Sequence, residues 1–174
     1  YINFGSIIVF FEKATNTIRI ETHQFDNFDD ICQPDELVDG DRAIKEASRY
    51  SSFLEKGDPN KLKSMKGFYQ DMGGHGTVKE VKYVLKEIVN YPSNYINIHK
   101  GWFQDTLPIN SENIGPIALL RLDGDWYAST KICLDYLYKY VSIGGFIVID
   151  DYCCYEGCQK AVDEFRNNHG ITDF

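Results

Sequence analysis

Two short runs of apolar residues, each followed at once by acids, most limit the folds open to this chain. Residues 117–122 read Ile-Ala-Leu-Leu-Arg-Leu and precede Asp123-Gly124-Asp125, while residues 146–149 read Phe-Ile-Val-Ile and precede Asp150-Asp151. Neither run alternates between apolar and polar residues, which is typical of strands buried on both faces of a parallel sheet. Together with the helical patterns that follow them, they predict an α/β fold: a doubly wound, mostly parallel sheet with helices on both faces.

The 174 residues are expected to form a single domain with one insertion. Residues 1–28 predict a strand, a short helix and a strand, at Tyr1–Gly5, Ile7–Lys13 and Thr17–Phe25. Residues 29–76 are first acidic and then basic, which indicates short solvated helices. Because glycines close this stretch at positions 73, 74 and 76, it is also predicted to be a lid-like helical insertion over a site.

From Thr77 onward the pattern is regular. Thr77 and Glu80 form a capping box that predicts the start of a helix, and apolar residues then recur at helical spacing up to Val89. We further expect a strand at Tyr95–His99, a helix at about Ser129–Tyr140, a turn at Gly144-Gly145 and a last helix ending at Gly170.

Composition excludes several classes of protein. Lys and Arg total 18 against 26 Asp and Glu, so the net charge of −8 argues against a nucleic-acid or anionic-membrane partner. The early apolar run Ile7–Phe11 is far shorter than a membrane helix requires. The five cysteines form no C-x-x-C pair, so we expect reduced thiols in a cytoplasmic protein rather than a zinc site.

The acids after the two apolar runs predict a metal site. Ligands of open parallel sheets bind beyond the carboxyl ends of the strands, and neighbouring strands would bring these carboxylates together. Crowded anions are costly unless a cation neutralises them, and hard oxygen ligands favour Mg²⁺. The alternative is that each Asp only caps the helix that follows it.

Other candidate residues carry weaker signals. Asp26 follows the second expected strand, where a carboxylate can bind the ribose hydroxyls of a nucleotide cofactor. His75 lies between the glycines of the expected lid and is the one histidine retained as a candidate proton acceptor. The aromatic residues that follow the acids, Trp126, Tyr127, Tyr152 and Tyr155, could line a sugar-sized pocket or belong to the core.

Four blocks in order over about 72 residues resemble the macrocin O-methyltransferase family: KGWFQDTLP (100–108), LLRLDGDWYAST (119–130), GGFIVIDDY (144–152) and GCQKAVDEFR (157–166) with HGI (169–171). Phe25-Asp-Asn-Phe28 is similar to the F-D-S-F block of that family, with Asn27 in place of Ser. The resemblance implies a Rossmann-like class I methyltransferase that uses S-adenosylmethionine and Mg²⁺ to methylate a sugar hydroxyl of a glycosylated small molecule or glycan. The family continues beyond the last block into two further strands.

The resemblance also implies roles for residues. The metal acids of the family fall on Asp123, Asp150 and Asp151, and Asp123 or His75 would accept the proton from the acceptor. For the cofactor, Gly5 and Ser6 would form the first loop, Asp26 and Asn27 would bind the ribose, and Gly101 and Trp102 would border the adenine. Tyr127 and Tyr152 would contact the substrate. Family precedent also allows a homo-oligomer.

Two alternatives differ from this interpretation. The first loop, Gly5-Ser6-Ile7-Ile8, has no second glycine, so the chain could be a pseudo-methyltransferase that serves as a binding or assembly subunit. Asp123-Gly124-Asp125 is also a D-x-D sequence, as used by metal-dependent glycosyltransferases.

Overall fold

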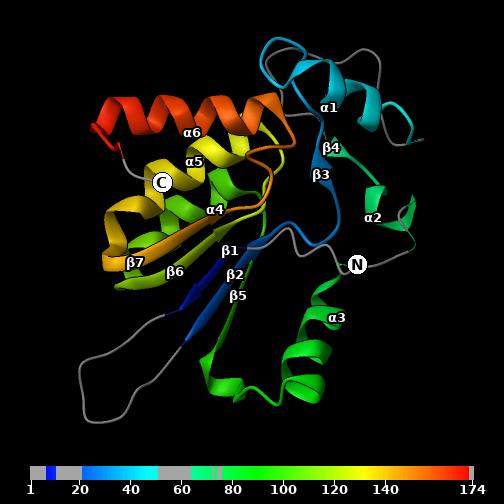
Figure 1. The fold of residues 1–174 in the computed structure, drawn as a ribbon. Coiled ribbons are helices and arrows are strands. Elements are labelled where there is room, and N and C mark those ends of the chain that lie inside the picture. The colour runs from blue at the N-terminus through cyan, green and yellow to red at the C-terminus, as the bar shows by residue number, and fades with distance from the viewer. Residues whose placement is uncertain (1–6, 11–20, 51–63, 72, 74–75, 173–174) are drawn as a thin grey trace.

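The computed structural model describes residues 7–10, 21–50, 64–71, 73 and 76–172 (Figure 1). Its central feature is one sheet with the strand order β5-β2-β1-β6-β7. The strands are β1 (Ile7–Phe10), β2 (Thr22–Asp26), β5 (Ile96–Lys100), β6 (Ile117–Leu122) and β7 (Val141–Ile149). β2 and β5 pair in parallel, as do β6 and β7. The expected α/β class with a mostly parallel sheet is therefore confirmed.

The first strand differs from the expectation. Residues 7–10 form β1 rather than the start of a short helix, and β1 runs antiparallel to both neighbours, β2 and β6. Ile-Ile-Val-Phe is rich in β-branched and aromatic side chains, and a run of four apolar residues fits a central strand better than one turn of helix. The predicted strand at Tyr1–Gly5 lies outside the described residues.

Three helices form a layer against the sheet: α4 (Phe103–Asn110), α5 (Tyr127–Leu137) and α6 (Glu156–His169). The main core cluster joins residues of these helices to Phe25, Ile117, Leu120 and Leu122 of the strands. α5 and α6 lie side by side over β6 and β7 in Figure 1. On β7, however, Ile143, Phe146 and Val148 are exposed, so no described helix covers that side of the strand.

The two glycines of β7 lie inside the strand, so the expected turn at Gly144-Gly145 is wrong. The register between β6 and β7 shifts between Ile117 and Leu119, which is a bulge-like irregularity. Gly144 has a φ of +81°, and a Cβ on Gly145 would approach the carbonyl oxygens of Ser142, Ile117 and Ala118 to 2.9–3.1 Å. Glycine thus permits a close approach of two strands at this point.

The helix after Thr77 begins as expected. Thr77 Oγ1 accepts a hydrogen bond from Glu80 N–H, and the carboxylate of Glu80 accepts one from Thr77 N–H. α3 (Val78–Tyr83) then continues as a π-helix over Val84–Ile88. Only Val81 of its apolar residues is buried, while Ile88 and Val89 are more than half exposed, so the helical spacing here does not mark a buried face.

Residues 29–76 contain four short described elements: β3 (Ile31–Cys32), α1 (Gly40–Ala47), β4 (Ser64–Met65) and α2 (Phe68–Asp71). β3 and β4 pair as a separate two-stranded sheet. Two small clusters hold them: Ala47, Met65, Phe68 and Tyr69 form one, and Cys32, Ala43 and Trp126 form the other. Trp126 comes from the start of α5, so this insertion packs on the main domain.

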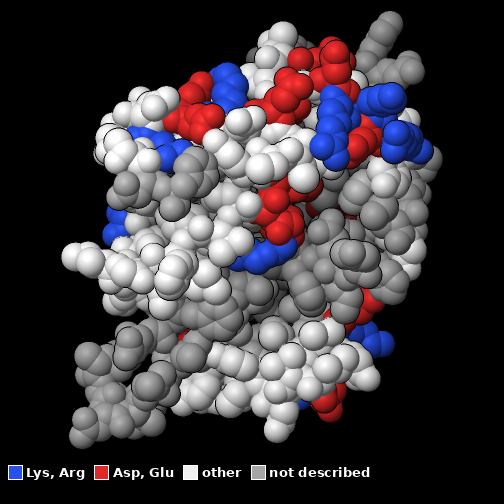
Figure 2. Space-filling model, in the orientation of Figure 1, with Lys and Arg blue, Asp and Glu red and all other residues white. Residues whose placement is uncertain are grey.

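The surface agrees with an acidic chain. On the face in Figure 2, the Lys and Arg residues are interspersed with Asp and Glu rather than gathered into a basic patch. Within the described part of the chain, no helix has the length and apolarity needed to cross a membrane.

Candidate functional site

The carboxyl ends of four strands meet at one edge of the sheet. β2 ends at Asp26 and β5 leads into Gly101, whose N–H donates to the carbonyl oxygen of Asp26 at 2.9 Å. β6 leads into Asp123, and Asp150 N–H donates to the carbonyl oxygen of Leu122 at 2.9 Å. Because β1 is antiparallel, its amino end reaches this edge, where Ile7 pairs with Phe25. This is the edge at which open α/β sheets bind ligands.

Three carboxylates converge at this edge. Asp123, Asp125 and Asp151 each place one carboxylate oxygen within 4.8 Å of the others. Asp125 has a φ of +55°, and its N–H donates to Asp151 Oδ2 at 3.2 Å. We call these three residues the acid cluster.

Burial strongly affects the charge of the acid cluster. Desolvation, with the nearby charges of Asp151 and Asp123, raises the pKa of Asp125 well above its usual range. Desolvation also raises the pKa of Asp123 to about 6, although the guanidinium of Arg121 opposes this rise. Because crowded carboxylates resist ionisation, the cluster favours either protons or a hard divalent cation, and its all-oxygen donor set fits Mg²⁺, Mn²⁺ or Ca²⁺.

Asp150 takes a different place from its neighbour. Its carboxylate accepts from Arg121 Nη2 at 3.1 Å, and Arg121 Nη1 donates to Asp123 Oδ2 at 2.8 Å. Two of the three expected metal acids, Asp123 and Asp151, thus lie together with Asp125, while Asp150 is held beside them by Arg121, and the role of Asp150 as a metal ligand stays a prediction. Adjacent residues at a strand end point in different directions, whereas the positive φ of Asp125 turns its side chain back toward Asp151.

A cavity of about 150 Å³ lies beside the acid cluster. Asp26, Asn27, Gly101 and Trp102, all expected to bind a cofactor, line it together with Asp123 and Asp125. Asp26 is 6% exposed, and its Oδ1 accepts from Phe28 N–H at 2.7 Å. Desolvation by burial raises the pKa of Asp26 to about 7, with the charge of Asp123 adding to the rise. We call this space the first cavity.

Tyr69 of α2 also lines the first cavity, and the sequence pattern did not indicate it. Burial raises the pKa of its phenol, as do the carboxylates of Asp26, Asp125 and Asp123, so the hydroxyl lies near acids from the ends of two strands, β2 and β6. Its neighbours in sequence, Phe68 and Gln70, form no motif, so only tertiary packing reveals this position.

A second cavity of about 130 Å³ adjoins the first and shares Ile31, Asp125 and Trp126 with it. Tyr155 lines the second cavity. The two expected substrate residues lie elsewhere: Tyr127 donates its hydroxyl to Glu164 at 2.7 Å, and Tyr152 donates to Asp163 at 2.8 Å, both on α6. Neither lines the two cavities formed by the described residues.

Three expected site residues cannot be placed. Gly5, Ser6 and His75 lie outside the described residues. Their roles therefore stay predictions, as does the expected movement of residues 29–76 as a lid.

Comparison with known proteins finds relatives that are O-methyltransferases. The family model "Macrocin-O-methyltransferase (TylF)" matches residues 79–174, more than half of the chain. A demethyldecarbamoylnovobiocin O-methyltransferase from Streptomyces niveus is 48% identical over 73 residues, covering 42% of this chain and 27% of the relative. The 8-demethyl-8-(2,3-dimethoxy-alpha-L-rhamnosyl)-tetracenomycin-C 4'-O-methyltransferase from Streptomyces olivaceus is 47% identical over 73 residues, with the same two coverages.

A solved structure supports the fold over most of the chain. The O-methyltransferase NovP superposes with a TM-score of 0.62 and 30% sequence identity, covering 87% of this chain and 53% of NovP. In the S. niveus and S. olivaceus enzymes, the segment matched by sequence spans about a quarter of the enzyme's own length. Because the family model matches most of the second half, including the strand-end acids, and the fold agrees with NovP, this chain belongs to the macrocin O-methyltransferase (TylF) family.

Proposed function

We propose that this chain transfers a methyl group from S-adenosylmethionine to a sugar hydroxyl of a glycosylated small molecule or glycan, with a divalent metal ion at the acid cluster. The observation that carries the proposal is the first cavity, in which Asp26 and Gly101-Trp102 lie beside Asp123 and Asp125. The relatives named above are O-methyltransferases, and the name of the S. olivaceus enzyme includes a rhamnosyl group. They give no support to a glycosyltransferase.

The donor would bind at the side of the cavity formed by β2 and β5. Asp26 would accept hydrogen bonds from the ribose hydroxyls, and Asn27 borders the same place. Trp102 offers an aromatic surface near Gly101, where the adenine would lie. A buried, hydrogen-bonded carboxylate facing a cavity suits a ligand that supplies two hydroxyl donors.

The acceptor hydroxyl would be held at the acid cluster. A divalent cation bound by Asp123, Asp125 and Asp151 would supply Lewis acidity and lower the pKa of the hydroxyl. Arg121 donates to Asp123 Oδ2, and we assign the carboxylate of Asp123, next to the acceptor oxygen, to accept the proton. The O–H bond then breaks as the new O–CH₃ bond forms and the C–S bond of the sulfonium breaks. S-adenosylhomocysteine leaves with the sulfur electron pair, and holding the two reactants in line supplies much of the rate enhancement.

Calorimetry with S-adenosylhomocysteine, with and without Mg²⁺, tests the proposal. We expect binding of the product, and methyl transfer to a rhamnoside acceptor detected by mass spectrometry that stops with EDTA. Asp123→Asn should abolish transfer while leaving product binding within a few-fold. A folded chain that binds no product would instead support the pseudo-methyltransferase alternative, and EDTA-resistant transfer would remove the metal from the proposal.

A further inference from the structure

The second cavity combines aromatic side chains with two carboxylates. Tyr50 and Phe68 pack edge to face at 4.8 Å between ring centres, and Trp126 and Tyr155 are 5.0 Å apart. All four rings line the cavity, and Glu46 and Asp125 supply its acidic groups. Residues from β4–α2, α1, α5 and the turn before α6 thus meet around one small space.

This combination suits one class of ligand. A sugar ring presents C–H faces that pack on aromatic rings and hydroxyl groups that donate to carboxylates. Both carboxylate oxygens of Glu46 accept from protein donors, Tyr155 and Arg42, but each oxygen keeps a second lone pair that a sugar hydroxyl can use and an apolar group cannot. A phosphate or other anion would be repelled by both carboxylates. The size of about 130 Å³ is enough for one sugar ring rather than a whole glycan.

Tyr155 connects Glu46 to the acid cluster. Its hydroxyl donates to Glu46 Oε2 at 2.8 Å, while Arg42 Nε donates to Glu46 Oε1 at 3.0 Å. Arg42 also lies 5.4 Å from the centre of the Tyr155 ring. Burial raises the pKa of Tyr155, and the charges of Asp125 and Asp151 contribute, so the phenol lies close to the acids of both cavities.

We propose that the second cavity is the acceptor subsite, that it holds the sugar ring that receives the methyl group, and that Glu46 and Tyr155 select the sugar by contacting its remaining hydroxyls. This inference rests on the proposed function, because Asp125 and Trp126 line both cavities and would then border both the donor and the acceptor. Glu46 and Tyr155 act as specificity residues and take no part in the proton transfer.

The chain offers a matched control for this pair. On α6, Tyr127 donates to Glu164, and Lys160 lies 4.5 Å from the centre of the Tyr127 ring and pairs with Glu164. The same trio of tyrosine, glutamate and cation thus occurs twice, once on the second cavity and once away from it. Tyr127→Phe and Glu164→Gln therefore remove the same chemical groups as Tyr155→Phe and Glu46→Gln.

The experiment titrates the full chain with methyl α-L-rhamnopyranoside and follows binding by NMR, with S-adenosylhomocysteine binding measured separately by calorimetry. Loss of one hydrogen bond to a charged group should weaken rhamnoside binding about tenfold in Glu46→Gln, and less in Tyr155→Phe. Both control variants should bind the rhamnoside as the parent does, and all four variants should keep S-adenosylhomocysteine binding.

Three outcomes would overturn the inference. They are equal rhamnoside affinity in Glu46→Gln and the parent, equal weakening by the control variants, or binding of cyclohexanol as tight as that of the rhamnoside, which would mark an apolar pocket. Failure of the proposed function is distinguishable: a chain that binds rhamnoside through Glu46 but never binds S-adenosylhomocysteine keeps the sugar site and loses the methyl donor.

Discussion

Asp125 shows how one backbone angle can decide the composition of a site. Asp125 lies beyond the end of β6 with a φ of +55°, and in this conformation its carboxylate lies with those of Asp123 and Asp151. Asp tolerates this left-handed conformation better than most residues with a side chain, because its short polar group forms local hydrogen bonds. The resulting cluster is stabilised by cations and destabilised by its own negative charge.

Asp26→Asn should stabilise the protein and weaken donor binding. The pKa of Asp26 rises from 3.8 to about 7 on folding, so the folded state holds this proton more tightly. Its contribution to stability therefore falls as the pH rises from about 4 to 7 and stays low above that. We expect the variant to melt at a higher temperature than the parent at pH 8, with a smaller difference at pH 5. S-adenosylhomocysteine affinity should fall about tenfold or more.

Asp29→Asn is the control, because Asp29 is exposed, pairs with Lys100 and does not line the first cavity, and its charge is only the smallest cause of the raised pKa of Asp26. Thermal melts at the two pH values and calorimetry measure both effects. A lower melting temperature for Asp26→Asn at pH 8 would show that the carboxylate serves the fold and not a ligand.

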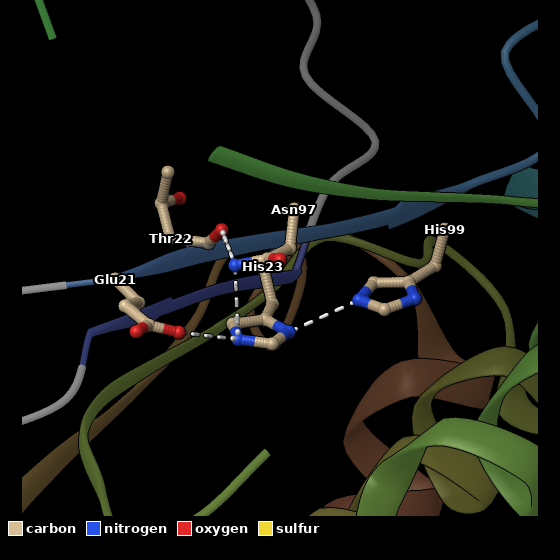
Figure 3. Close-up of polar contacts among 5 residues, drawn as sticks. All are labelled: Glu21, Thr22, His23, Asn97 and His99. Carbon is tan, nitrogen blue, oxygen red and sulfur yellow. Dashed lines mark hydrogen bonds and ion pairs between the residues drawn. The ribbon is translucent and has the colours of Figure 1, made fainter. Parts of the chain in front are cut away.

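The buried His23 and the half-buried His99 form a pair that makes the free energy of unfolding depend on acid (Figure 3). His23 Nδ1 and His99 Nε2 are 3.0 Å apart, and Asn97 Nδ2 approaches both His23 Nε2 and the carbonyl oxygen of Thr22. Glu21 Oε2 also lies 3.8 Å from His23 Nε2. The His23 ring is thus surrounded by polar groups of β5 and of the residue just before β2.

His23→Gln should reduce the loss of stability in acid. Burial, with the nearby His99, lowers the pKa of His23 from 6.5 to about 4. The unfolded chain therefore binds this proton first as the pH falls, and stability declines between pH 6.5 and 4. Chemical denaturation of the variant across this range should show a shallower decline than the parent. If the free energy of unfolding of His23→Gln declined as steeply with falling pH as that of the parent, the lowered pKa of His23 would be contradicted.

At the scale of elements, much of the second half could be predicted from sequence. The continuous apolar strands β6 and β7, the capping box of α3 and the buried face of α6 all carry local signals that tertiary packing reinforces. β1 was expected to be helical, because an apolar run this short shows no period and only its β-branched and aromatic composition favours a strand. The strand-end acids indicated the site, whereas Tyr69 and Glu46 reach it only through packing of residues 29–76.

The attachment of α1 to α6 depends on Gly157, a residue of the GCQKAVDEFR block. Asp39, just before α1, accepts from Tyr127 N–H and Asp35 N–H at 2.7 Å each. A Cβ on Gly157 would lie 1.9 Å from Asp39 Oδ1, so Gly157→Ala must displace this turn. We expect a loss of about 1–3 kcal/mol of unfolding free energy, measured by denaturant titration. Gln159→Ala, on the exposed side of α6, should change it little, and an equally stable Gly157→Ala would contradict this packing.

At the scale of the whole molecule, the sheet brings two kinds of group to one edge. β2 and β5 present Asp26 and Gly101, where the donor is proposed to bind, and β6 and β7 present Asp123 and Asp151. A ligand that contacts both pairs of strands should stabilise the entire fold. S-adenosylhomocysteine at 100 times its dissociation constant should add about 2.7 kcal/mol, or roughly 5–10 °C in melting temperature.

The same shift in melting temperature, measured with and without Mg²⁺, tests whether the metal and the donor each stabilise the fold. We expect metal and S-adenosylhomocysteine each to raise the melting temperature, and Asp26→Asn to lose only the second effect. A metal effect that disappears in Asp26→Asn would place the ion at a different carboxylate.

The antiparallel strand β1 lies between these two halves. Its four described residues pair with β2 on one side and β6 on the other, and no other described strand joins the parallel pair β2–β5 to the parallel pair β6–β7. The spacing between the groups proposed to bind donor and acceptor therefore depends on the few main-chain hydrogen bonds that pair β1 with β2 and β6. A slip of β1 by one rung would shear the two sheet halves past each other and misalign the reactants, even with every side chain of the site intact.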